Sequence, residues 1–233
     1  MTNRTVETSR QFYARLAGFT ILFYIVVGFT SVTLYNRATD AEGTHATLLH
    51  ISEHASAFRV TILLELLESF SAVVLAVTLY GITRDESHEL AMLGLVCRVC
   101  EGLLGALGIR TTLGLLWLTK AGAGAGGPVA ADTLGDFLLM PIQSGMIGAT
   151  FFAVGTLIFS YLLLRGRIIP VPLAWLGVFA SLLLVVGLPL QLADFFKVPL
   201  SGYLWLPMIA FQIPLGLWLL IKGVPTITQR QPT

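Results

Sequence analysis

Five charged residues lie well inside long apolar stretches of the sequence, away from the ends of those stretches, where charged side chains are costly and therefore informative. They are Glu65, Glu68, Arg98, Glu101 and Arg110. An ionisable group at the centre of a bilayer costs about 2.5 to 3.5 kcal/mol on insertion scales, so such a group needs a partner or a function. Carboxyl groups in this setting can act as general acids or bases, and together the five groups can bind a polar ligand.

Helical geometry divides these residues into two layers. Counted at about 1.5 Å per residue along two antiparallel helices, Glu68, Arg98 and Glu101 lie at a similar depth, and Arg98 and Glu101 are neighbours at i and i+3. Glu65 and Arg110 lie further outward and are expected to form a second pair. Three carboxyl groups share this region with two guanidinium groups, so one carboxyl group is left without a basic partner and is available for acid or base chemistry. The candidate catalytic residues are therefore Glu68 and Glu101.

Small residues follow the same helix face as the charges. Glu101, Gly105 and Gly108 share one face, which predicts close approach of the two charged helices. The alternative to a functional site is a buried polar clasp, in which the charges neutralise each other between two helices and do no chemistry.

Further polar side chains occur in the later apolar stretches. The additional candidates for ligand binding are Gln143, Gln191, Asp194 and Gln212. With the charged residues they would line a pocket open to the outer leaflet, although each amide could instead only bridge neighbouring helices. Four aromatic residues fit an interfacial belt or bundle packing better than a cofactor site, and they are Tyr24, Tyr35, Tyr203 and Trp205.

The elements that must position these residues are transmembrane helices. The chain is 55% hydrophobic and only 12% charged, which is outside the range of soluble globular proteins. Six apolar stretches are long enough to cross a bilayer, at residues 16–35, 58–82, 90–118, 137–164, 171–195 and 204–224. The sequence therefore predicts an all-α polytopic bundle that forms a single transmembrane domain over residues 1–233.

The distribution of Lys and Arg predicts the orientation of this bundle. Basic residues are more frequent beside one set of span ends, at Arg4, Arg10, Arg15, Arg84, Arg165, Arg167, Lys222 and Arg230. The positive-inside rule then places both termini in the cytoplasm. The net charge of +1 and the absence of a basic run argue against a nucleic-acid partner. The apolar composition makes the lipid bilayer the expected partner.

A histidine pair in the first outer loop is a weak metal candidate. His50, Glu53 and His54 match the H-x-x-E-H spacing of some zinc proteases. The alternative is an amphipathic lead-in to the second span, and we predict no metal site. No cofactor is expected either, because the spans lack a central Lys for retinal and a central His for haem.

Short motifs along nearly the whole chain resemble the bacterial membrane family known as domain of unknown function 4386. The motifs are Ala14-Arg15-Leu16-Ala17-Gly18, Phe58-Arg59, Arg98 with Glu101, Leu176-Gly177 after Pro172, and the closing Leu217-Trp218-Leu219-Leu220-Ile221-Lys222-Gly223-Val224. The resemblance implies a bundle of about six helices in a bacterial inner membrane and no established activity.

Three functions are compatible with this reading. The first is binding or transfer of a small lipophilic molecule through an outward-facing polar pocket. The second is a membrane-embedded enzyme that uses an intramembrane Glu as acid or base, and the third is a structural or regulatory partner of another membrane protein.

Overall fold

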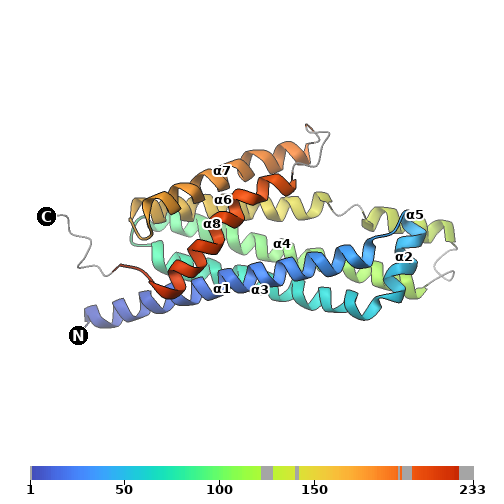
Figure 1. Cartoon of the computed structure of the whole chain (residues 1–233), viewed down its shortest axis with the longest axis horizontal. Helices are drawn as coiled ribbons and strands as arrows, with labels where there is room; N and C mark the ends of the chain where they lie inside the picture. The colour runs from blue at the N-terminus through green and yellow to red at the C-terminus, as the bar shows by residue number, and fades with distance from the viewer. Residues whose placement is uncertain (1, 122–127, 140–141, 194, 196–200, 226–233) are drawn as a thin grey trace.

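A computed structural model of the chain describes residues 2–121, 128–139, 142–193, 195 and 201–225, and the regular structure in these residues is helical (Figure 1). The helices are α1 Thr2–Thr39, α2 Thr44–Glu53, α3 Ala55–Thr83, α4 His88–Ala121, α5 Pro128–Leu139, α6 Ile142–Arg165, α7 Val171–Leu192 and α8 Ser201–Ile221. Six of them, α1, α3, α4, α6, α7 and α8, are long and apolar enough to cross a membrane. The predicted all-α, multi-pass bundle is confirmed.

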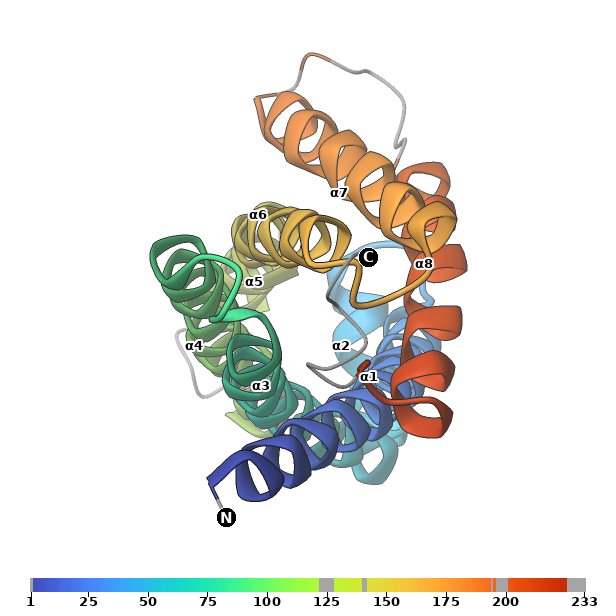
Figure 2. The same cartoon turned by 90° about the vertical axis from the view of Figure 1, so that its left-hand side faces the viewer.

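The six long helices form a ring in chain order. α1 packs against α3, α3 against α4, α4 against α6, α6 against α7, and α7 against α8, which returns to α1 (Figure 2). The short connections from α3 to α4 and from α6 to α7 favour this neighbour-to-neighbour, antiparallel arrangement. α7 packs against α6 and α8 and lies at the outside of the bundle (Figure 2).

The predicted fourth span is wrong at its start. It begins at Phe137, but Phe137 lies near the end of the short helix α5, and the spanning helix α6 begins at Ile142. Pro141 stands between the two helices in the sequence, and a proline lacks the N–H that a continuous helix needs at that point. Hydropathy cannot register this break because both segments are apolar.

The start of α1 and the end of α8 lie at the same end of the bundle, here called the termini end. The Gln11 side chain exchanges two hydrogen bonds with the backbone of Val224: its amide nitrogen donates to the Val224 carbonyl, and its oxygen accepts from the Val224 N–H. An even number of spans requires this arrangement. The cytoplasmic location of this end stays a prediction from the Lys and Arg distribution.

Apolar packing is densest in the half of the bundle near the termini end. A large buried cluster joins all six long helices there and includes Ala17, Leu79, Phe159, Leu184 and Leu219. A smaller cluster lies at the opposite end, here called the far end, where Leu48 and Ile51 of α2 pack against Phe58 and Leu115. Polar residues occupy the region between the two clusters, in the middle of the far half.

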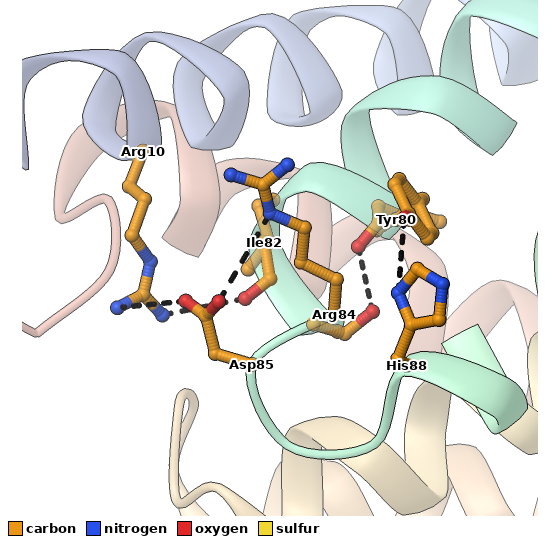
Figure 3. Close-up of polar contacts among 8 residues, drawn as sticks. Arg10, Tyr80, Ile82, Arg84, Asp85 and His88 are labelled. Atoms are coloured by element: carbon orange, nitrogen blue, oxygen red, sulfur yellow. Dashed lines mark hydrogen bonds and ion pairs between the residues drawn. The ribbon is translucent and has the colours of Figure 1, made fainter. Parts of the chain in front are cut away.

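The α3–α4 turn is fastened to α1 at the termini end (Figure 3). The Arg10 guanidinium donates from Nη2 to the Ile82 carbonyl at 3.3 Å, and Nη1 lies 3.8 Å from an Asp85 carboxylate oxygen. Across the turn, the Tyr80 hydroxyl lies 3.3 Å from His88 Nδ1. These contacts fix how far α3 and α4 slide along α1, which sets the depth of the charged residues further along both helices.

Replacing Arg10 by methionine is expected to lower the free energy of unfolding by about 1.5 to 3 kcal/mol, because the charged hydrogen bond to the buried end of α3 is lost. The exposed Asp85 contact adds little. Denaturant titration of the purified protein in mixed micelles measures the change. Arg15→Met is the control, since Arg15 is exposed on the same helix. An equal loss in both variants would show that the fastening at Ile82 has no special role.

Candidate functional site

A cavity of about 490 Å³ lies inside the far half of the bundle. Its described lining residues come from α1, α3, α4, α6 and α8, and along α1 they extend from Tyr24 to Asn36. That stretch of helix is about 18 Å long at 1.5 Å per residue. The volume is within the usual range of pockets that bind small organic molecules.

Small residues keep the cavity open. Gly105, Gly108, Gly145 and Gly148 line it from α4 and α6. A Cβ atom at Gly108 or Gly145 would meet nothing within 4 Å. The prediction that Gly108 marks a close helix contact is therefore wrong, because this glycine faces empty space.

The inner end of the cavity is a buried polar cluster of Tyr24, Arg98 and Glu101. Arg98 Nη1 lies 2.7 Å from Glu101 Oε2, and the two residues are only 2% and 7% exposed. The Tyr24 hydroxyl donates to Glu101 Oε1 at 2.8 Å. Glu101 Oε1 therefore has a hydrogen-bond partner and Oε2 an ion-pair partner, and because Arg98 and Glu101 belong to the same helix, it is the Tyr24 hydrogen bond that joins Glu101 to α1.

Arg98 lies behind Glu101 and does not itself line the cavity. Its guanidinium carbon is 4.8 Å from the ring centroid of Phe152 and 5.7 Å from that of Tyr24, which favours cation–π attraction. Gly155 of α6 leaves room for its stem, since a Cβ there would lie 3.0 Å from Arg98 Cγ.

Glu68 of α3 reaches the same layer and lines the cavity. A Cβ at Gly28 of α1 would lie 3.0 Å from Glu68 Oε1, so this glycine makes space for the carboxyl group. At the adjoining positions α3 and α4 touch, because a Cβ at Gly102 would lie 2.8 Å from the Ser69 carbonyl oxygen. This contact holds α3 and α4 close together beside Glu68 and Glu101.

Glu65 also lines the cavity, but its partner is Thr112 rather than Arg110. The Thr112 hydroxyl lies 3.2 and 3.1 Å from the two carboxylate oxygens of Glu65. Arg110 is exposed and forms no ion pair with any residue of the described ranges. It follows Glu101 by about two and a half turns of helix and so points away from the cavity. The predicted outer pair does not form.

The described residues that line the cavity do not include the other predicted binding residues. Gln191 and Gln212 are half-buried on α7 and α8, away from the cavity lining. Gln143 lies in α6 and Asp194 follows α7, but both side chains are outside the described residues. The later spans contribute Phe152 and Trp205 instead, whose rings lie 5.4 Å apart.

Sequence reasoning missed the polar face of α1. Tyr24, Ser31, Tyr35 and Asn36 all line the cavity. Tyr24, Ser31 and Tyr35 recur at i, i+7 and i+11, which is the period of one helix face. Reading that periodicity, rather than leaving the two tyrosines to an interfacial belt or to bundle packing, would have identified α1 as part of the cavity wall.

The histidine pair lies outside the cavity. The rings of His50 and His54 are 4.4 Å apart, and their Nδ1 atoms face the carbonyl oxygens of Ala38 and His50. Among the described residues there is no group of three or more His, Cys, Asp or Glu side chains placed to hold a metal ion.

The cavity lining is acidic. Three of its residues are Glu, at positions 65, 68 and 101, and none of the described lining residues is Lys, Arg or His. The rest of the wall is a mixture of aromatic, aliphatic and hydroxyl side chains. The arrangement can receive a molecule that is largely apolar and carries one polar group.

Comparison with known proteins finds one family. The family described as Domain of unknown function (DUF4386) matches residues 16–223, which include every described residue that lines the cavity. The resemblance stated from the sequence motifs is confirmed. No curated protein and no solved structure gives a significant match to the chain.

Proposed function

Because the chain belongs to the family described as Domain of unknown function (DUF4386), we propose a function from its cavity: it binds or transfers a small lipophilic molecule. The proposal places the protein in the inner membrane of a bacterium with both termini in the cytoplasm. The far end, and with it the cavity, then faces the outer leaflet.

One observation carries this proposal: an open cavity at membrane depth is lined by both carboxyl groups and aromatic rings. Val32, Leu104, Phe152 and Trp205 supply apolar surface, while Glu68 supplies a polar group. Ligand pockets typically combine a mostly apolar lining with a few placed polar groups. A purely structural partner would need no such space, and a filled bundle would serve it better.

A membrane enzyme is the second candidate, and the position of Glu68 favours it. Glu101 is a poor acid or base because both its oxygens are engaged, by Tyr24 and by Arg98. Glu68 lines the cavity and forms no ion pair with the described residues. It is therefore the residue on which general acid or base catalysis would depend.

Filling the cavity tests the binding proposal. In Gly108→Phe the ring would enter the open space beside Gly108, so a co-purifying small molecule should fall by roughly tenfold or more. Native mass spectrometry and solvent extraction of gently purified protein measure the occupancy. The control is Leu107→Phe, which adds a ring at the neighbouring position, where the side chain is 59% exposed.

The expected result is a specific molecule that is present in the wild type and in Leu107→Phe but depleted in Gly108→Phe. Equal occupancy in all three proteins at matched folding would contradict binding in this cavity. An empty wild type would favour the structural role.

A further inference from the structure

We infer that the molecule bound in this cavity is a lipophilic organic cation, such as a protonated amine or a quaternary ammonium compound with an apolar body. The inference rests on the proposed binding function and adds the charge of the ligand to it. Three features of the cavity support it: the balance of charge on the wall, the position of the nearest arginine, and the aromatic surface.

The balance of charge on the wall favours a cation. Glu65, Glu68 and Glu101 line the cavity, and the described lining contains no basic side chain. Only Glu101 has an ion-pair partner within the described residues, which is Arg98. Charges attract more strongly in a low-dielectric interior than in water, so a positively charged ligand would gain from Glu65 and Glu68.

The nearest arginine is not available to an anionic ligand. Arg98 is 2% exposed, is paired with Glu101, and has Phe152 and Tyr24 beside its guanidinium. Arg110 is exposed on the opposite face of α4. An anion in the cavity would therefore meet carboxyl groups without a free counter-charge.

The aromatic surface distinguishes an organic cation from a metal ion. Tyr24, Tyr35, Phe152 and Trp205 line the same space. The Arg98 guanidinium lies against the rings of Tyr24 and Phe152, which leaves Tyr35 and Trp205 as the rings that can attract an organic cation. The described residues hold no cluster of three or more ligating side chains of the kind that binds a metal ion. A cavity of about 490 Å³ also far exceeds the size of a bare ion.

The test compares two probes of the same shape and opposite charge, tetraphenylphosphonium and tetraphenylborate. The full chain is reconstituted in nanodiscs of zwitterionic lipid, and equilibrium binding is measured after subtraction of protein-free discs. We expect saturable binding of tetraphenylphosphonium, and at least roughly tenfold weaker binding of tetraphenylborate because its charge repels the carboxyl groups.

Charge-removing variants assign this selectivity to the cavity wall. Glu65→Gln and Glu68→Gln should each weaken tetraphenylphosphonium binding by roughly tenfold, since an isosteric amide keeps the shape and loses the charge. Glu42→Gln is the matched control: the same change at an exposed residue that does not line the cavity. Thermal midpoints verify that all the variants are folded.

Each other outcome overturns the inference. Equal or tighter binding of tetraphenylborate would do so, and so would unchanged tetraphenylphosphonium affinity in the double variant Glu65→Gln/Glu68→Gln. The same holds if neither probe binds the wild type. The binding function is judged separately: if Gly108→Phe still depletes a co-purifying molecule, that function stands and only the charge assigned to the ligand is wrong.

Discussion

Replacing Arg98 by methionine is expected to lower the free energy of unfolding by about 3 to 5 kcal/mol, because a buried carboxylate would lose its charge partner. The two groups are 2.7 Å apart, and Glu101 remains 7% exposed with no other cation paired to it in the described residues. The Tyr24 hydroxyl keeps one hydrogen bond to Glu101 but carries no charge. Titration from stabilising into denaturing micelles, followed by circular dichroism, measures the loss.

A second substitution separates the charge effect from packing. In Arg98→Met/Glu101→Gln the orphaned charge is absent, so more than half of the lost stability should return. Arg110→Met is the control for losing an arginine from the same helix, and it should cause no loss because Arg110 is exposed. A double variant as unstable as the single one would show that Arg98 acts through its packing on Phe152 instead.

Replacing Gly18 by alanine is expected to cost about 3 kcal/mol, at the upper end of overpacking effects. The new Cβ would lie 2.5 Å from the Leu220 backbone nitrogen and 2.6 Å from the Gly216 carbonyl oxygen. Both neighbours are backbone atoms of α8, so no side chain can rotate away and the two helices must separate. The same micelle titration measures the change.

Gly145→Ala is the matched control for the Gly18 variant. It makes the same substitution within a spanning helix, but its Cβ would meet nothing within 4 Å. We expect it to be neutral or slightly stabilising, because alanine favours helix more than glycine does. If Gly18→Ala were equally neutral, the α1–α8 contact would not be what closes the ring at the termini end.

Local sequence properties were sufficient for the class of protein and for part of the site. A span is recognised by the length of its apolar stretch relative to the bilayer, and this is a property of one segment. The proximity of Arg98 to Glu101 follows from their i and i+3 spacing on one helix. For the same reason the fourth span began wrongly at Phe137, since apolar composition does not register the separation of α5 from α6.

The contacts between residues of different helices could not be predicted from local sequence properties. Counting residues gives the depth of Glu65 and Arg110 but not the direction in which each side chain points. Tyr24 and Glu101 are 77 residues apart, and only the packing of α1 beside the charged helices brings them together. A glycine in a helix is compatible both with a close helix contact and with an open cavity wall, so the sequence alone could not decide between these for Gly108.

The sequence by itself therefore determined the membrane class, the number of spans and the residues costly enough to need partners, because these depend on local composition and helical period. Only the tertiary structure decided that Glu65 meets Thr112, that Arg110 points away and that three carboxyl groups share one cavity. Those outcomes depend on the rotation of each helix about its axis, which is fixed by contacts such as Gly18 with α8 and Gly102 with α3.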